Sequence, residues 1–358
     1  MHLIMKMIVS LLIFVESLEF VKGHDQGGLS LLKRCPGTYC GQHLLPDGNW
    51  SSCGACPRGY RANLSSVCVE CVGSPEFYDW LYLGFMVILA LVLHWFCIDS
   101  AMRARLLGQQ QGDASFTREV LVLHASALGE VSIAVFTTLL VLEPRGSLEI
   151  RACPIKSLAD WYTLLHNPSP QYEQTLHCTQ EAVFPLYSMV FIFYSCCVVV
   201  LLLVRPWLVR LVTSPPGANS QQPWNNPHPL PRHGKATIYA ALYFLPVLAL
   251  IHALFAGLVY YAFPYILIVM SLISNAAHFA FKEDQSVRGL VTSTVSNLRN
   301  SVILVGHWTL HAYAIVAIMH QELREYATNL ALLSLVPLPA IFYILTARFT
   351  DPNKMHNE

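Results

Sequence analysis

Charged residues are scarce in this chain of 358 residues. Asp, Glu, Lys and Arg together make up 12% of the sequence, about half the share found in typical soluble domains. Hydrophobic residues make up 54%, more than a protein surrounded by water can bury. The 22 basic and 22 acidic residues cancel, so the basic surplus typical of nucleic-acid binding is missing. This composition argues against a disordered chain and predicts that the lipid bilayer is its solvent.

Long segments without charged side chains predict seven transmembrane helices. At a rise of 1.5 Å per residue, about 20 residues cross a hydrocarbon core. Five segments fit one crossing each: residues 81–98, 120–142, 183–204, 301–319 and 330–347. Residues 236–281 contain no Asp, Glu, Lys or Arg and predict two crossings joined by a tight turn near Gly257. Because backbone groups in lipid need internal hydrogen bonds, the predicted fold class is an all-α polytopic membrane protein with a small disulfide-rich lumenal module.

The N-terminus predicts a signal peptide rather than a crossing. Lys6 precedes a short apolar run from Ile8 to Val15, which Glu16 ends, and such a run is typical of secretory signals. An uncleaved extension is the alternative. The predicted organisation is therefore a possible signal peptide (1–23), a lumenal cysteine-rich module (24–79), a seven-helix domain (80–347) and a cytosolic tail (348–358).

Two independent patterns predict the orientation. The glycosylation sequons at Asn49 and Asn63 both precede the first crossing, and such sites are used only on the lumenal or extracellular side. Twelve basic residues then fall on the cytosolic side and four in the lumenal loops, as the positive-inside rule requires. Among the twelve, Arg205 and Arg210 are expected to anchor the end of the third crossing at the headgroups. The multi-pass protein is predicted to have a lumenal N-terminus and a cytosolic C-terminus.

Eight of the eleven cysteines lie in the predicted lumenal segments. Six are clustered before the first crossing, and two C-x2-C pairs among them could bind zinc. The sequons place this stretch in an oxidising compartment, which favours disulfides instead. Six cysteines allow fifteen pairings, so their connectivity stays open, while a Cys153–Cys178 bond is predicted within the second lumenal loop. The disulfide candidates are Cys35, Cys40, Cys53, Cys56, Cys68, Cys71, Cys153 and Cys178.

Ionisable residues inside the predicted helices raise the alternative of an intramembrane enzyme. His307 and His311 are four residues apart and share a helix face, so they could bind zinc together with Glu130 or His124. That arrangement would suit a zinc-dependent lipid hydrolase. Alkaline ceramidases also have seven helices and an H-x3-H pair, but their S-x3-H unit and Asp partner are not found in matching places. We favour interhelical hydrogen bonding as the role of these groups, which also include His94, His252 and His278. The sequence predicts no catalytic residue and no cofactor.

Ten segments, in the same order along the chain, resemble the c-Jun N-terminal kinase-associated membrane protein family (JAMP). They cover most of the chain from Cys35 to Pro352. The segments are CPGTYCG (35–41), CPRGYR (56–61), SPEFYDWLYLGFM (74–86), HWF (94–96), DWYTLLHNPSPQY (160–172), HCTQEAVFPLY (177–187), IYAALYF (238–244), YYAFPYI (260–266), HWTLHAY (307–313) and LVPLPAIFYILTARFTDP (335–352).

The resemblance implies an adaptor of the endoplasmic reticulum membrane rather than an enzyme. Members of the family are understood to bind the stress-activated JNK-type kinase, to recruit proteasome subunits and degradation components, and to be substrates of a membrane RING ubiquitin ligase. The predicted cytosolic stretches 211–236 and 282–300 resemble the family least, although cytosolic partners are expected to dock on that side of the membrane. The first is rich in proline between Pro215 and Pro231, which suits a docking segment or a flexible linker. A receptor whose cysteine-rich module binds a ligand is a third possibility.

Overall fold

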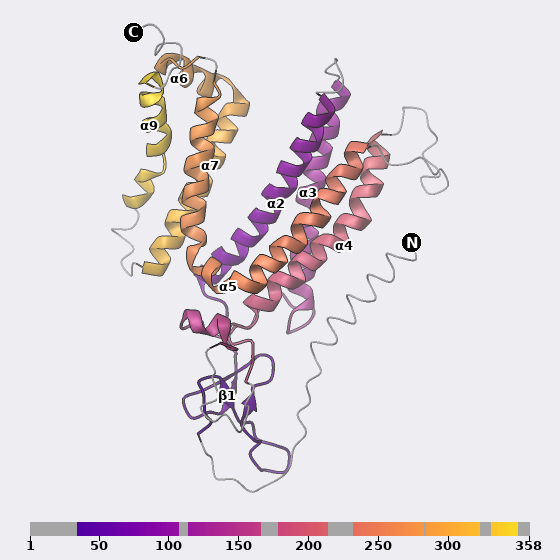
Figure 1. Ribbon diagram of the computed structural model, residues 1–358, viewed down its shortest axis with the longest axis vertical. Helices are drawn as coiled ribbons and strands as arrows, with labels where there is room; N and C mark the ends of the chain where they lie inside the picture. The colour runs from indigo at the N-terminus through magenta and orange to yellow at the C-terminus, as the bar shows by residue number, and fades with distance from the viewer. Residues whose placement is uncertain are drawn as a thin grey trace. The chain divides into compact units, whose positions relative to one another are not determined.

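The computed structural model describes residues 34–106, 114–165, 178–213, 232–282, 284–322 and 331–349. The described chain is mostly helical, with two small sheets near its N-terminal end (Figure 1). The signal-like segment 1–23, the proline-rich stretch 215–231 and residues 350–358 of the tail lie outside the described residues. Two compact units are present. The first holds the described residues up to Glu76 and from Leu83 to Gly257, and the second holds Phe77–Tyr82 and those from Leu258 onward.

The segment before the first helix forms two short antiparallel hairpins. In one, β1 (Cys40–Gly41) pairs with β2 (Gly54–Ala55), and in the other β3 (Tyr60–Ala62) pairs with β4 (Cys68–Glu70). Strands of two or three residues cannot stabilise a module of this size by their own ladders. Covalent cross-links must therefore supply much of its stability.

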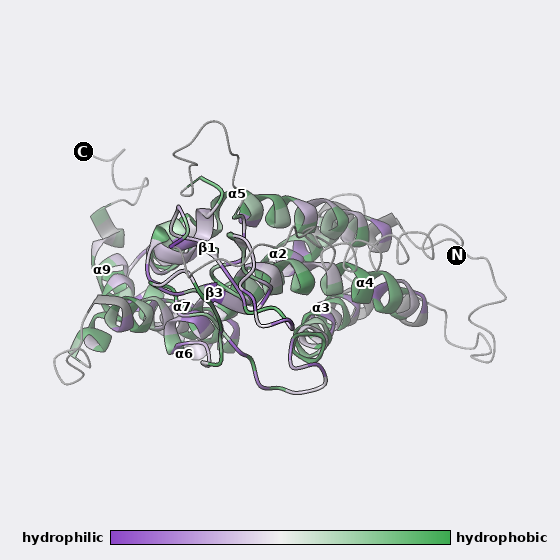
Figure 2. Cartoon of the chain, turned by 90° about the horizontal axis from the view of Figure 1, so that it is seen from below, coloured by the Kyte–Doolittle hydropathy of each residue, from purple (hydrophilic) through white to green (hydrophobic). Residues whose placement is uncertain are grey.

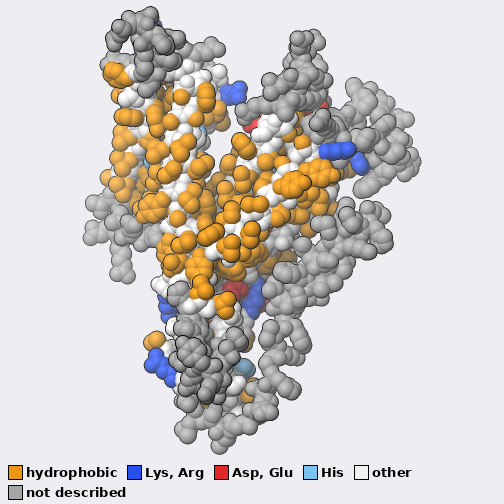
Figure 3. Space-filling model, in the orientation of Figure 1, with side chains coloured by type: hydrophobic (Ala, Val, Ile, Leu, Met, Phe, Trp, Pro, Cys, Tyr) orange, Lys and Arg blue, Asp and Glu red, His pale blue; other side chains and the backbone are white. Residues whose placement is uncertain are grey.

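Five helices are long and apolar enough to cross a membrane among the described residues. They are α2 (Phe77–Leu106), α3 (Ala114–Val141), α4 (Leu186–Thr213), α5 (Arg232–Ala280) and α7 (Leu298–Glu322). Hydrophobic residues dominate these helices, and hydrophobic side chains cover the visible outward faces (Figures 2 and 3). Leu121 is 69% exposed, Phe136 61% and Tyr243 74%. Side chains of this type, at this exposure on several helices, are suited to contact with lipid.

The helix α5 has no loop near Gly257, where the sequence predicted a tight turn between two crossings. All 49 of its residues are helical, and the boundary between the two compact units falls inside it, directly after Gly257. Gly257 serves another purpose, because a Cβ atom there would lie 2.7 Å from Cβ of Trp161 and 2.9 Å from Cδ1 of Leu158. Both residues belong to the 3-10 helix η1 (Leu158–Tyr162). Glycine at this position therefore allows η1 to pack directly against the α5 backbone.

Proline residues inside α5 leave backbone carbonyls without their usual helical partners. Pro264 has no N–H to donate to the carbonyl of Tyr260. The hydroxyl of Tyr78 in α2 donates to that carbonyl at 2.8 Å. In the same place, the hydroxyl of Tyr260 donates to Asp79 at 2.7 Å. The start of α2 and the second half of α5 are thus held together by reciprocal hydrogen bonds.

The last predicted crossing, 330–347, is not one regular helix. It consists of η2 (Ala331–Leu335), α9 (Leu338–Thr346) and η3 (Ala347–Phe349). Pro337 and Pro339 explain the interruption, because proline cannot donate a backbone hydrogen bond and is accommodated best in a first helical turn. The short helix α6 (Val287–Ser296) precedes α7. The structure confirms a mostly helical membrane protein, and the number of seven crossings stays a prediction.

Candidate functional site

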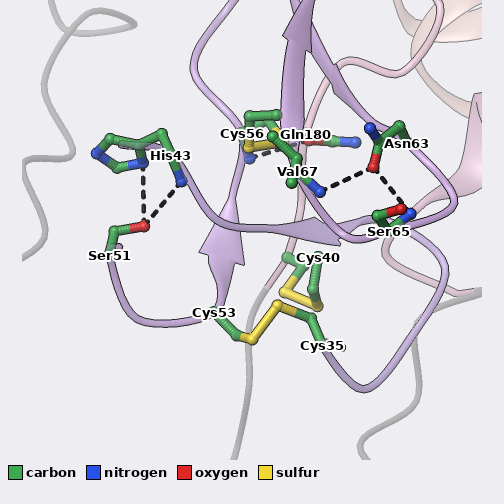
Figure 4. The surroundings of a disulfide bond; sticks show 12 residues. Cys35, Cys40, His43, Ser51, Cys53, Cys56, Asn63, Ser65, Val67 and Gln180 are labelled. Carbon is green, nitrogen blue, oxygen red and sulfur yellow. Dashed lines mark hydrogen bonds between the residues drawn. A yellow bond between two sulfur atoms is a disulfide. The ribbon is translucent and has the colours of Figure 1, made fainter. Parts of the chain in front are cut away.

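Four disulfides join the cysteine-rich segment into one body with the loop between α3 and α4. All eight candidate cysteines take part. Two bonds lie within the segment, Cys35–Cys53 (Figure 4) and Cys56–Cys68, and two reach the loop, Cys40–Cys178 and Cys71–Cys153. The predicted Cys153–Cys178 bond is wrong, because each of these cysteines pairs with the N-terminal segment instead. We call the described residues 34–76, 142–165 and 178–185 the disulfide cap.

Hydrogen bonds add to these cross-links. The N–H of Ala152 donates to the carbonyl of Gly73 at 2.7 Å, and the N–H of Cys56 donates to Oε1 of Gln180 at 3.0 Å (Figure 4). The helices α2 and α3 separate the two parts of the disulfide cap along the chain. Two successive crossings return a chain to its starting side, so this contact agrees with both helices crossing the membrane.

A buried carboxylate connects three parts of the disulfide cap. Asp160 is 3% exposed, and its Oδ1 lies 2.7 Å from Nη2 of Arg61 and accepts the hydroxyl of Tyr39 at 2.8 Å. Its Oδ2 accepts the backbone N–H groups of Lys156 at 2.7 Å and Ser157 at 3.1 Å. Burial, and then the neighbouring carboxylate, raise the pKa of Tyr39 well above its ordinary value of about 10. Sequence reasoning missed this cluster, although Asp160 begins one of the segments that resemble the family.

The two sequons differ in exposure. Asn63 is exposed, and its Oδ1 accepts the N–H groups of Ser65 at 2.9 Å and Val67 at 3.0 Å (Figure 4). Asn49 is half-buried, and its Nδ2, the atom that would carry a glycan, donates to Asp47 at 3.1 Å. The hydroxyl of Ser51 in the same sequon is 3.1 Å from the N–H of His43. Glycosylation stays a prediction, and Asn63 is the more accessible acceptor.

An ion pair lies inside the first unit. Arg205 of α4 is completely buried, and Glu130 of α3 is 2% exposed. The guanidinium binds the carboxylate with both ends, through Nε to Oε1 at 3.1 Å and Nη2 to Oε2 at 2.7 Å. It also donates to Nδ1 of His94 in α2 at 3.2 Å and to the carbonyl of Thr237 in α5 at 3.4 Å. The hydroxyl of Ser126 also donates to Oε1 of Glu130. We call these five residues the charge cluster.

The charge cluster corrects the prediction that Arg205 anchors a helix end at the headgroups. Pro206 does not end α4, which continues to Thr213, so Arg205 lies two turns inside the helix. Arg210 is exposed. Removing Arg205 from the cytosolic count leaves eleven basic residues against four, so the orientation prediction is unaffected. The charge cluster connects helices to one another, because α2, α3, α4 and α5 all contribute residues to it.

The remaining membrane histidines lie in separate places. His124 contacts Asp99 at 3.3 Å, and its ring is 2.8 Å from the carbonyl of Val120. His252 donates to the carbonyl of Tyr187 at 3.0 Å. In the second unit, the rings of His278 and His307 are 6.3 Å apart. These contacts fit the interhelical role that the sequence favoured.

The pair His307 and His311 receives no third ligand among the described residues. Nδ1 of His307 lies 3.1 Å from the hydroxyl of Ser274, and His311 is 8% exposed. Glu130 is bound by Arg205, and His124 contacts Asp99. No group of three His, Cys, Asp or Glu residues that could hold a metal is found in the part of the chain that the structure describes.

Comparison with known proteins decides the family. A family model described as "JNK1/MAPK8-associated membrane protein" matches residues 35–352. The chain belongs to the JNK1/MAPK8-associated membrane protein family. Proteins of that name from Mus musculus and Homo sapiens are each 43% identical over 328 residues, which cover 90% of this chain and 96% of theirs. A homolog from Caenorhabditis elegans is 30% identical over 303 residues, covering 84% of both chains. No solved structure matches.

Family membership confirms the resemblance on which the sequence interpretation depends. The relatives are named for association with the kinase JNK1/MAPK8 in a membrane setting, and their names describe no catalytic activity. All eight cysteines of the disulfide cap and all five residues of the charge cluster fall within the matched range.

Proposed function

We propose that this protein is an adaptor of the endoplasmic reticulum membrane. It recruits proteasome subunits and components of ER-associated degradation to clear misfolded proteins, and it modulates signalling by a JNK-type stress kinase. Kinase association follows the names of the relatives. The proteasome, the degradation components and the membrane RING ubiquitin ligase follow from what the family resemblance implies. Family membership is the observation that carries the proposal.

The disulfide cap supports a lumenal position for the N-terminal module. Disulfides persist in oxidising compartments such as the lumen of the endoplasmic reticulum, and this small body contains four of them. The tail then faces the cytosol if the chain crosses seven times. The apolar segment Gly234–Ala280 of α5 has 47 residues, which provides enough chain for two crossings of about 20 residues each. The segment Ala331–Thr346 would make the last crossing.

Cytosolic partners would bind the segments on the side opposite the disulfide cap. In the proposed orientation these include the connections 107–113 and 214–231 and the tail after Phe349. The proline-rich part, 215–231, can take the extended conformation that docking domains bind. A flexible linker is the competing interpretation of the same residues.

Capture of partners from stressed cells tests the proposal. The full-length protein, tagged at its C-terminus, should recover both the kinase and proteasome subunits from mild-detergent extracts. A matched variant in which residues 215–231 are replaced by a Gly-Ser linker of equal length should lose at least one of them. Electrophoresis without reducing agent should show the disulfides intact in both proteins. Recovery of neither partner by the properly folded protein would overturn the adaptor proposal.

The structure does not favour the zinc-dependent lipid hydrolase. Such a site needs at least three protein ligands, and no group of three His, Cys, Asp or Glu residues that could hold a metal is found among the described residues. We therefore do not propose it. Metal analysis of the purified protein provides a direct check, because stoichiometric zinc that is lost in the double variant His307→Ala, His311→Ala would revive the hydrolase.

A further inference from the structure

The helix α6 packs against the second unit with only one of its faces. Leu290 is completely buried and Thr294 is 6% exposed. Leu290 belongs to a core cluster whose other members come from α5, α7, α9 and η3: Phe279, Leu304, Ala340 and Ala347. Figure 1 shows α6 next to α7 and α9 at one end of this group. The position of α6 within the second unit is thus fixed by packing.

Both ends of α6 have satisfied backbone groups. The hydroxyl of Ser286 accepts the N–H of Gly289 at 3.0 Å, as an N-cap does. At the other end, Asn300 donates to the carbonyl of Ser293 at 2.9 Å and Ser301 donates to that of Thr294 at 2.6 Å. Because groups at both helix ends are bonded within the protein, α6 can lie in a region with little water.

A second face of α6 is apolar and exposed. It is formed by residues spaced three or four apart, which lie above one another on a helix. Their exposed fractions are 37% for Val287, 45% for Val291 and 75% for Val295. We call these three residues the apolar stripe. Leu298, the first residue of α7, is 79% exposed. Exposed hydrophobic residues continue next to it in the sequence, with Phe281 before α6 and Val302 and Val305 in α7.

The third face of α6 is polar and carries positive charge. At 100° per residue, it lies on the side of the apolar stripe that points away from the buried face. Its exposed members are Arg288, Thr292 and Ser296. Arg299, in the first turn of α7, is also exposed. Going around the axis, α6 therefore presents a packed face, an apolar stripe and a basic polar face. This order is typical of a helix that lies in the plane of a membrane surface.

The connections of α6 keep it near the ends of two helices that are long enough to cross the membrane. Only Asn297 separates α6 from α7, and six residues separate it from the end of α5 at Ala280. Since one residue spans at most about 3.6 Å, the C-terminal end of α6 cannot move far from the start of α7.

We infer that α6 lies at the boundary between headgroups and acyl chains of the bilayer that holds the protein. The apolar stripe contacts acyl chains, in continuity with the exposed apolar surface of α7. Arg288 and Arg299 face the phosphates, whose charge complements theirs. This inference does not depend on the adaptor proposal. It assigns much of the segment 282–300 to lipid rather than to a cytosolic partner.

Fluorescence quenching on two adjacent residues tests this placement. Single cysteines at Val295 and Ser296, in a background without Cys97, Cys196 and Cys197, would carry an environment-sensitive label. The full-length protein, with its disulfides intact, would be reconstituted into vesicles of phosphatidylcholine and phosphatidylserine. We expect brominated lipids to quench the label at Val295 severalfold more than that at Ser296. Aqueous iodide should give the reverse order.

Two outcomes would overturn the inference. Equal quenching of both labels by iodide would place the apolar stripe in water. Protection of Val295 from both iodide and brominated lipid would show that another protein surface covers it. Val291 and Thr292 form a second matched pair on the same two faces, so a labelling defect at one pair does not leave the inference untested. All four side chains are exposed, so labels there do not disturb the core.

Discussion

The buried ion pair between Arg205 and Glu130 gives the sharpest prediction about stability. Both side chains are buried, with exposed fractions of 0% and 2%, and their closest approach is 2.7 Å. Removing one partner of such a pair leaves an uncompensated buried charge, which costs about 3 to 5 kcal/mol. Replacing both partners by neutral residues of similar volume costs little or even stabilises. We expect Arg205→Met to be strongly destabilising and the double variant with Glu130→Gln to recover most of the loss.

Thermal unfolding of the purified protein in detergent measures this effect. A change of 1 kcal/mol shifts the Tm of a domain of this size by about 2 to 4 °C, so Arg205→Met should lower it by about 6 to 20 °C. Arg210→Met is the matched control, because Arg210 is on the same helix but exposed, and it should change Tm by only a degree or two. A Tm in Arg205→Met equal to that in Arg210→Met would refute the reasoning. So would a double variant as unstable as the single one.

Three further substitutions probe the disulfide cap and its packing. Gly41→Ala places a Cβ 2.6 Å from both sulfurs of the Cys56–Cys68 disulfide. Thiol titration should show this bond lost, which costs about 2 to 5 kcal/mol of stability. In the control Gly54→Ala, whose added Cβ meets nothing within 4 Å, the bond should be retained. Gly257→Ala should destabilise the first unit by about 1 to 3 kcal/mol through overpacking. Gly129→Ala, also in a helix but with open space around the added Cβ, should leave Tm equal or higher. An equal loss of Tm in both variants would contradict the proposal that Gly257 allows η1 to pack closely against α5. Burial raises the pKa of Glu181 above its ordinary value of about 4.3. The stability that protonated Glu181 gives the folded protein is therefore complete below about pH 4.3 and is lost as the pH rises through the raised pKa. The Tm of the unmodified protein relative to Glu181→Gln should therefore fall as pH rises above about 4.3, and a rise would contradict the assignment.

The helical membrane class and the presence of disulfides could be predicted because each depends on a local signal. An uncharged run shows directly which segment can enter lipid, and sequons beside cysteines indicate an oxidising compartment. The pairing could not be predicted, because Cys40 and Cys178 are 138 residues apart. Their contact requires α2 and α3 to bring two distant segments to the same side. Local spacing favoured Cys153–Cys178 instead, and that choice was wrong.

Arg205 and Gly257 were misinterpreted for a related reason. A charged residue after a long apolar run is typical of a helix end at the membrane surface, yet α4 continues past Pro206, and the partner that neutralises Arg205 is on another helix. Glycine in a long apolar run suggested a turn, but its role depends on Trp161, which packs against it from η1. In both cases the deciding atom lies far away in the sequence. Reasoning from local composition could not place it.

Sidedness is the central claim of this account, and a protection experiment in sealed microsomes measures it most directly. The protein would carry an epitope at its C-terminus and be treated with protease from outside, with and without detergent. We predict that Asn63 carries a glycan removable by endoglycosidase, that the disulfide cap is protected until detergent is added, and that the epitope is lost without detergent. Protection of both ends, or digestion of both ends, in intact vesicles would contradict the proposed topology and with it the adaptor proposal.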